Sequence, residues 1–227
     1  MRRAAAALAA LLLLSCDRHQ PQHARAEAPA TRPPLALLTG LPLAFGEGFT
    51  LDAPRHPVLS RLDRDYQVEL VDGPEQLGQT WLLLAAQPRA LTAERLVALD
   101  RWVRRGGRLL LLADPQLNWP TDLPLGDPQR PPYEYADTGL LGHWGLRLEQ
   151  PDAASASGAV VLGGQSVATS SPGTLHRTGG NCRIAPDQHL AACRLGKGQA
   201  VVVADADFLG SPGGPDAVAA LLQQVGR

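Results

Sequence analysis

WLLLAAQPRALTAERLVALDRWVRRGGRLLLLADP, residues 81–115, is the stretch that decides the fold. Residues 81–86 and 108–113 are almost entirely apolar, which is typical of strands covered on both faces. Between them, apolar residues at helical spacing predict a helix over 92–105, and two glycines end it. A strand, a helix and a second strand joined by short links form a βαβ unit. The two strands are therefore expected to be parallel, with a right-handed crossover.

The flanking sequence continues the alternation of strands and helices. A proline-rich region, residues 114–138, follows the second strand, and we call it the long loop. The pattern then turns to short β segments. We predict one α/β domain over 34–227. Its remaining elements are strands near 34–42, 66–71 and 199–204, helices at 57–64, 139–145 and 216–225, and β segments at 147–149, 158–168 and 182–194.

Residues 1–15 are predicted to be a lipoprotein signal peptide rather than a transmembrane helix. Eleven apolar residues, Ala4–Leu14, follow two arginines. As a helix they span about 16 Å, about half of a bilayer's hydrocarbon core. The next residues, Leu13-Leu14-Ser15-Cys16, resemble the lipobox of bacterial lipoproteins, which implies cleavage before Cys16 and acylation of that residue. An ordinary secretory signal with an incidental cysteine is the alternative.

Residues 16–33 are predicted to be the lipidated cysteine and a flexible tether. Residues 17–34 contain four prolines and no large apolar residue, so they cannot bury enough surface to offset ordering. The expected root-mean-square reach is about 25 Å. Asp17 resembles the residue that retains Gram-negative lipoproteins in the inner membrane. We therefore expect the domain on the periplasmic face of that membrane, attached through its lipid anchor.

Cys182 and Cys193 are the remaining cysteines of the three in the chain. Their separation suits one disulfide in an oxidising compartment, with two free thiols as the alternative. No metal site is expected, because the cysteines and nearby histidines lack the spacing of zinc modules. The net charge of −1 excludes a basic field for nucleic acid, and no motif points to a cofactor.

Four segments carry a family resemblance: PLALLTGLPL (34–43), the βαβ stretch, HWGLRLE (143–149) and GKGQAVVVADADFLG (196–210). Together they resemble the extracytoplasmic domain of ABC-type transport-system accessory proteins, including the gliding-motility type. That family lies in the class I glutamine-amidotransferase-like superfamily. The resemblance implies a flavodoxin-like, mostly parallel sheet flanked by helices, with a β-rich C-terminal extension. It also implies a role beside a transporter or in glycan binding.

The acyl-transfer machinery of active amidotransferases is missing from the sequence. Those enzymes place a cysteine in a Gly-x-Cys-x-Gly elbow and follow it with His-x-Glu. Here the strand ends in Ala113-Asp114-Pro115, and no downstream histidine is followed by glutamate two residues later. We therefore predict no catalytic residue. A hydrolase built from Ser170 or Ser171 with His176 and Asp205 is a lesser alternative, because no nucleophile elbow surrounds these serines.

Polar and aromatic residues gather where the predicted strands end, and in open α/β sheets ligands bind beyond the carboxyl ends of strands. For the carboxylates, the default interpretation is hydrogen bonding to loop N–H groups. A ligand or divalent-cation role and acid–base chemistry are the alternatives. Four aromatic residues lie in or near the long loop: Trp119, Tyr133, Tyr135 and Trp144. They either hold this loop against the core or form a binding surface. The candidate ligand or partner residues are Thr39, Gly40, Glu47, Gln87, Asp114, Asn118, Trp119, Tyr133, Asp205 and Asp207.

The sequence thus predicts a non-catalytic, lipid-anchored periplasmic domain. The family resemblance implies that its partners are the membrane subunits of an ABC transporter. Because the chain has neither a P-loop nor a spanning segment, it would act as an accessory. The alternative is a glycan- or cell-envelope-binding module. Neither interpretation names a cofactor.

Overall fold

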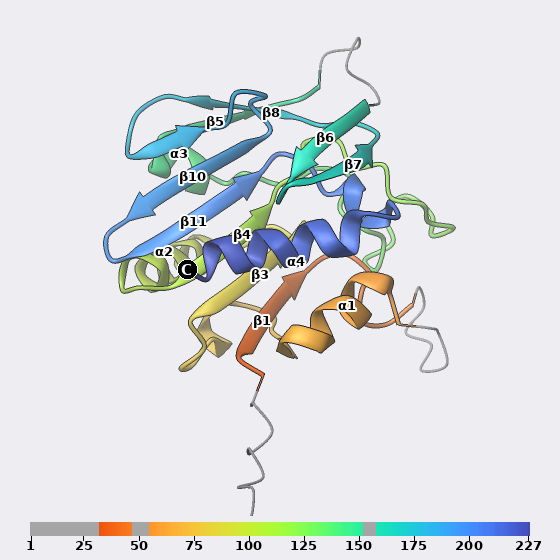
Figure 1. The fold of residues 1–227 in the computed structure, drawn as a ribbon, viewed down its shortest axis with the longest axis horizontal. Helices are drawn as coiled ribbons and strands as arrows, with labels where there is room; N and C mark the ends of the chain where they lie inside the picture. Colours follow the sequence, from red (N-terminus) through yellow and green to blue (C-terminus); the bar gives the residue numbers. More distant parts are fainter. Residues whose placement is uncertain (1–31, 47–54, 152–157) are drawn as a thin grey trace, which may run out of the picture. The chain divides into compact units, whose positions relative to one another are not determined.

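A seven-stranded sheet in the order β2-β1-β3-β4-β11-β10-β9 forms the centre of the domain (Figure 1). The computed structural model describes residues 32–46, 55–151 and 158–227. The parallel strands are β1 (Pro34–Thr39), β2 (Gln67–Leu70), β3 (Leu82–Ala86), β4 (Arg108–Leu112) and β11 (Gly198–Val203). The antiparallel strands β10 (Leu190–Leu195) and β9 (Cys182–Ile184) complete the sheet.

The parallel strands have the flavodoxin-like order 2-1-3-4-5, in which β11 takes the fifth place. The predicted fold class and the βαβ unit are confirmed. The β-rich extension consists of β9, β10, a hairpin and a separate pair. The hairpin is β6 (Gly158–Leu162) with β7 (Gln165–Thr169), and the pair is β5 (Leu146–Glu149) with β8 (Thr174–Arg177). The sequence did not predict β8, because its four residues lie among glycines and carry little β pattern.

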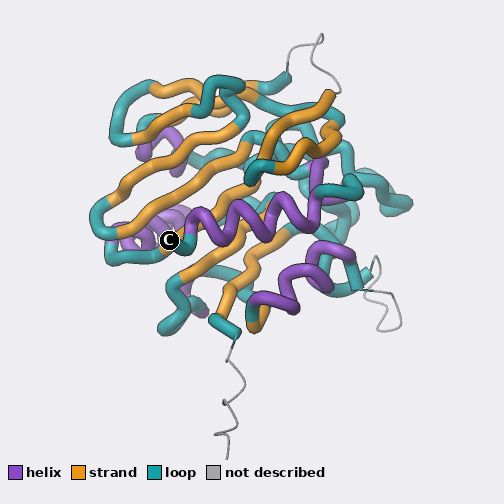
Figure 2. The backbone as a smooth tube through the Cα atoms, viewed as in Figure 1, coloured by secondary structure: helices purple, strands orange, loops and turns teal. Residues whose placement is uncertain are grey.

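Helices and the extra strands cover both faces of the sheet (Figure 2). One face packs against α1 (Pro57–Asp65), α4 (Gly214–Val225) and the β6–β7 hairpin. The other packs against α2 (Ala93–Arg104), α3 (Leu140–Trp144), the 3-10 turn η2 (Pro74–Gln76) and the β5–β8 pair. Because both faces are covered, all five residues of β3 are buried, which explains their uninterrupted apolar run.

Local sequence signals set the bounds of α2. The hydroxyl of Thr92 accepts a hydrogen bond from the N–H of Arg95, so Thr92 is the N-cap. Leu99 and Val103 are buried against the sheet. Gly106, with φ of 126°, turns the chain into β4 after the helix ends. The predicted helix and its N-cap are confirmed.

The predicted disulfide is present in the structure. Cys182 and Cys193 are partners in the β9–β10 ladder, with their Cα atoms 4.0 Å apart, and their sulfurs are bonded. Both residues are buried in the core on the α2 side of the sheet. The bond therefore fastens the last strand of the sheet to its neighbour.

The chain from Arg32 onward forms one unit of its own. The signal peptide, Cys16 and all but the end of the tether lie outside the described residues. Within the part that is described, no helix combines the length and the apolar character needed to cross a membrane.

Gly198 is expected to be sensitive to the smallest side chain. A Cβ at this position would overlap the carbonyl oxygens of Val103 and Gly107, which are backbone atoms where α2 meets β4 and β11. Gly198→Ala should lower the free energy of unfolding by about 3 kcal/mol, as overpacking of a core does. Urea unfolding measures the loss. Gly158→Ala is the matched control, because its Cβ meets nothing within 4 Å; similar losses in both variants would contradict this packing.

Removing the disulfide should destabilise the domain. It closes a loop with a sequence separation of 11, for which chain entropy gives about 2–3 kcal/mol. Cys182→Ala/Cys193→Ala should lower the melting temperature, and adding reductant to the wild type should lower it by a similar amount. The melting temperature of the double variant should not respond to reductant. A wild type that melts identically with and without reductant would refute the prediction.

Candidate functional site

Three buried polar residues directly follow the central parallel strands. Gln87 comes after β3, Asp114 comes two residues after β4, and Asp205 comes two residues after β11. Each has an exposed fraction of 0%. Parallel strands bring their carboxyl ends to one edge, so these side chains meet at what we call the carboxyl edge, toward the upper right of Figure 1.

Gln87 fixes the backbone of Asp114. Its Oε1 accepts from the N–H of Asp114 at 2.8 Å, and its Nε2 donates to the carbonyl of Asp114 at 3.0 Å. The side chain thus adds one more pair of hydrogen bonds beyond the β3–β4 ladder. Gln87 itself has φ of 44°, an uncommon value for a residue other than glycine. This conformation turns its side chain back across the ends of the strands.

The carboxyl group of Asp114 joins two distant segments. Its Oδ1 accepts from the N–H of Gln116 at 2.8 Å, and its Oδ2 accepts from the N–H of Ala206 at 2.9 Å. The first bond forms the turn that leaves β4. The second fixes the segment that leaves β11, which is 92 residues away in sequence.

Asp207 and Ser171 extend this network into the long loop. Asp207 accepts from the N–H of Asn118 at 2.7 Å, and the amide of Asn118 donates to the hydroxyl of Ser171 at 2.8 Å. That hydroxyl lies 2.7 Å from the second carboxylate oxygen of Asp207. The turn that begins at Asp207 has no side-chain capping hydrogen bond. Instead, Asp205 accepts from the N–H of Asp207 at 2.8 Å.

Burial and mutual repulsion perturb two of these carboxyl groups. Burial raises the pKa of Asp114 to about 8, and the charges of Asp207 and Asp205 add to the effect. Burial is also the main cause that raises the pKa of Asp205 to about 6. Among the described residues, neither Asp205 Oδ2 nor Thr169 Oγ1 makes a hydrogen bond of normal geometry, although the hydroxyl still favours the ionised form of Asp205.

The three aspartates fit the default interpretation of loop carboxylates. Asp114, Asp205 and Asp207 offer oxygens within 4.8 Å of one another, a donor set that divalent cations also use. However, five of their six oxygens already take part in hydrogen bonds with backbone N–H groups or the hydroxyl of Ser171. These bonds hold the loops after β4 and β11 together, so the cluster is first of all a structural one.

A depression of about 280 Å³ opens at the ends of β1 and β2, at the same edge of the sheet as this cluster. It lies beside the point where the strand order reverses between β1 and β3, the usual ligand position in this topology. Most of its lining is apolar, with a polar residue from each of several loops. The lining includes Thr39, Gly40, Phe45, Asp72, Arg89, Leu123 and Gln129.

Gly40 allows the chain to pack closely beside the depression. Its N–H donates to the carbonyl of Gln87 at 3.1 Å, and a Cβ would lie 2.6 Å from that oxygen and 2.9 Å from Pro132. The hydroxyl of Thr39 donates to Ala86 and accepts from the N–H of Leu41. Thr39 and Gly40 therefore lie at the depression, as their candidate role requires.

The remaining candidates are placed differently. The ring of Trp119 lies against His56, with centroids 5.5 Å apart, and packs on the core. Tyr133 is 62% exposed and does not line the depression. Glu47 lies outside the described residues. The sequence analysis missed the pocket residues Arg89, Leu123 and Gln129. Their loops are irregular, and no spacing in them signals a shared cavity.

The residues of the hydrolase alternative do not meet. Ser171 contacts Asp207 and Asn118, whereas the Nε2 of His176 lies 2.9 Å from Glu149. A serine nucleophile needs its base within hydrogen-bond reach. No such pair forms between these two residues.

Comparison with known proteins identifies the family. A model described as a domain of unknown function, DUF4350, matches residues 58–214. The chain belongs to the DUF4350 family. The matched region begins in α1 and includes every strand of the sheet except β1. It contains the aspartate cluster and the lining residues of the depression that follow α1. The lining residues in β1 and in the loop after it lie outside the match. No curated protein sequence matches this DUF4350 chain.

Several solved structures share the fold of this DUF4350 domain. A GH42 β-galactosidase from G. stearothermophilus is 16% identical with a TM-score of 0.52, and the match covers 86% of this chain and 30% of that one. An exo-β-1,4-mannosidase from an Opitutaceae bacterium is 14% identical, with a TM-score of 0.50 and 86% and 35% coverage. The chain thus spans about a third of these glycosidases. A cytoplasmic protein of Salmonella typhimurium LT2 is 12% identical, with a TM-score of 0.53 and 84% and 98% coverage.

Asp205→Asn should stabilise the domain at pH 8. A carboxyl whose pKa is raised by folding favours the folded state below its unfolded pKa, and this contribution is lost as the pH rises through the folded pKa. For Asp205 that window runs from about 4 to about 6. Asparagine removes the buried charge while its oxygen still accepts from the N–H of Asp207. We expect a melting temperature a few degrees higher at pH 8 and little change at pH 4.

Asp114→Asn provides the contrast. Both oxygens of Asp114 accept from backbone N–H groups, and an asparagine nitrogen cannot accept. This variant should therefore lose about 1–3 kcal/mol at pH 4. At pH 8 the loss should be smaller, because asparagine also removes a carboxyl whose pKa is raised to about 8. If Asp205→Asn destabilises at pH 8 as much as Asp114→Asn does, the unpaired oxygen of Asp205 is not a source of instability.

Proposed function

We propose that this DUF4350 chain is a non-catalytic, lipid-anchored accessory domain. In this proposal it lies on the periplasmic face of the bacterial inner membrane and binds a membrane subunit of an ABC-type transport complex. The supporting observation is that the carboxylates and the depression at the carboxyl edge have different roles. The carboxylates that would be needed for chemistry hold the loops together, while the depression at the same edge is lined mainly by apolar side chains.

The character of the depression supports a protein partner. Its lining is mainly aliphatic, from Leu37, Leu41, Leu70 and Leu123 among others, with Arg89 and Asp72 as charged members. A volume of about 280 Å³ is near the lower end for small-molecule sites. It suits one or two side chains of a partner segment, held by apolar contact and oriented by the two charges.

The placement of the aromatic residues argues against the glycan-binding alternative. Trp144 is buried and Trp119 packs on the core. Tyr135 is also packed against the core on the other face of the sheet. Tyr133 is exposed but stands apart from the depression. Trp119, Tyr133, Tyr135 and Trp144 therefore offer no sugar-stacking platform at the depression, whose aromatic lining residue is Phe45.

In-cell crosslinking tests the partner. Tagged chain is crosslinked and recovered from solubilised inner membranes, and the co-purified proteins are identified by mass spectrometry. We expect one ABC permease with its ATPase. Leu123→Asp, which places a charge in the depression, should reduce their recovery by about tenfold or more, as the loss of a binding hot spot does.

Leu125→Asp is the matched control in the same loop. Leu125 is 89% exposed and does not line the depression, so recovery should stay at the wild-type level. Recovery of envelope polysaccharide in place of a permease, or equal loss in both variants, would overturn the proposed partner site. The mass of the mature N-terminal peptide tests acylation of Cys16 separately.

A further inference from the structure

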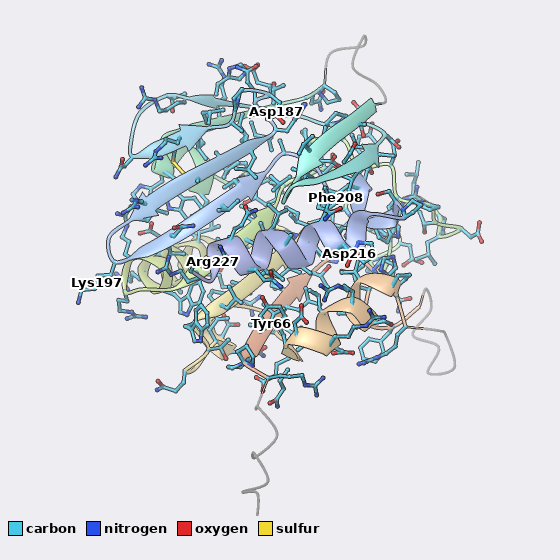
Figure 3. The ribbon with its side chains drawn as sticks, in the orientation of Figure 1. Tyr66, Asp187, Lys197, Phe208, Asp216 and Arg227 are labelled. Atoms are coloured by element: carbon cyan, nitrogen blue, oxygen red, sulfur yellow. A yellow bond between two sulfur atoms is a disulfide. The ribbon has the colours of Figure 1, made fainter. Side chains whose placement is uncertain are left out.

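The opposite edge of the sheet, where the parallel strands begin, has a chemistry of its own. Register places Arg108 between Leu82 of β3 and Gln199 of β11. Trp81 and Lys197 stand just before these strands, at the same end of the sheet. We call this end the amino edge. In Figure 3, Lys197 lies toward its left-hand side, where β11 begins.

The amino edge carries unpaired positive charge. Arg64 lies near the end of α1, Arg105 caps the end of α2, and Lys197 lies in the β10–β11 turn, all three exposed. With Arg108, none of them forms an ion pair with any described residue. The carboxylates of these helix ends are already neutralised: Asp65 pairs with Arg61, Asp100 with Arg104 and Asp63 with Arg55.

An exposed tryptophan belongs to the same edge. Trp81 is 41% exposed, and its ring lies beside Gly226, where a Cβ would be 3.5 Å away. Its backbone carbonyl accepts from the N–H of Arg108 at 2.8 Å, so Trp81 and Arg108 lie side by side at the starts of β3 and β4. Tryptophan favours the boundary between water and lipid, because its ring is apolar and its N–H is polar.

We propose that the amino edge lies against the anionic phospholipid head groups of the membrane that carries the lipid anchor. This inference rests on the proposed acylation of Cys16. Fifteen residues separate Cys16 from Arg32, and even fully extended they reach no more than about 58 Å. Arg32 leads into β1 at the amino edge, so the tether joins the domain at this edge.

Because the lipid anchor keeps the domain near the membrane, a weak attraction between the basic residues and the anionic lipid is enough to orient it. Each lysine or arginine near an anionic surface contributes a small favourable free energy, and the contributions add. The anchor keeps the domain at a high effective concentration near the lipid, so weak contacts suffice to orient it. In this orientation the carboxyl edge and its depression face away from the lipid, toward the parts of a transporter that stand above the membrane.

Quenching of Trp81 fluorescence tests the orientation. The mature full chain is reconstituted in vesicles of brominated phosphatidylcholine, alone or in equal parts with brominated phosphatidylglycerol. The difference between the wild type and Trp81→Phe isolates the signal of Trp81. We expect quenching in the anionic vesicles and little in the neutral ones. Arg105→Gln/Lys197→Gln should lower the ratio of docked to undocked domain by about tenfold, and added salt should act in the same direction.

Arg95→Gln/Arg147→Gln is the matched control. It removes the same charge from exposed ion pairs with Glu75 and Glu149, which contribute little to stability, and it should leave the quenching unchanged. Equal quenching in neutral and anionic vesicles, or equal loss in both double variants, would overturn the inference.

Acylation of Cys16 and binding of the amino edge to lipid can be tested separately. If mass spectrometry finds no acyl chain on Cys16, the same chain is added to preformed vesicles and cosedimented. Binding to phosphatidylglycerol that Arg105→Gln/Lys197→Gln weakens would then keep the lipid-facing edge and reject only the anchor. No binding under those conditions would reject the edge as well.

Discussion

The carboxyl group of Asp114 is the constraint on which the carboxyl edge depends. A fully buried acid is costly in a protein interior, and this one is compensated by N–H groups from two segments, at Gln116 and Ala206. Through these bonds the turn after β4 and the turn after β11 become one rigid unit. The long loop then rests on that unit, because the N–H of Tyr135 donates to the carbonyl of Asp114 at 2.7 Å. The shape of the neighbouring depression follows from where this loop is held.

Much of the fold could be predicted because its signals are local. The apolar runs of β3 and β4, the N-cap Thr92 and the cysteine spacing each report on structure within a few residues or one ladder. For the carboxyl edge, the residues that directly follow strands could be predicted, and those in irregular loops could not. Gln87, Asp114 and Asp205 follow strands, so strand order alone brings them together. Ser171 and the pocket residues of the long loop could not be placed, because irregular loops carry no periodicity that fixes their tertiary contacts.

The parallel sheet gives the domain two chemically different ends. Buried acids and an apolar depression occupy the carboxyl edge, while exposed cations and a tryptophan occupy the amino edge. A polarity of this kind is a natural result of parallel strands, since every strand contributes its start to one end and its finish to the other. The shared fold with parts of much larger glycosidases concerns the scaffold, because the chain matches about a third of their length.

The position of β11 has a consequence for biosynthesis. β11 pairs with β4 on one side and β10 on the other, yet it is the last strand of the chain. Until it is made, β4 presents an open row of backbone donors and acceptors flanked by leucines, which is the kind of edge that aggregates. The centre of the sheet therefore closes only after nearly the whole polypeptide has been made. During synthesis β4 therefore remains an unpaired edge until the residues of β11 have been made.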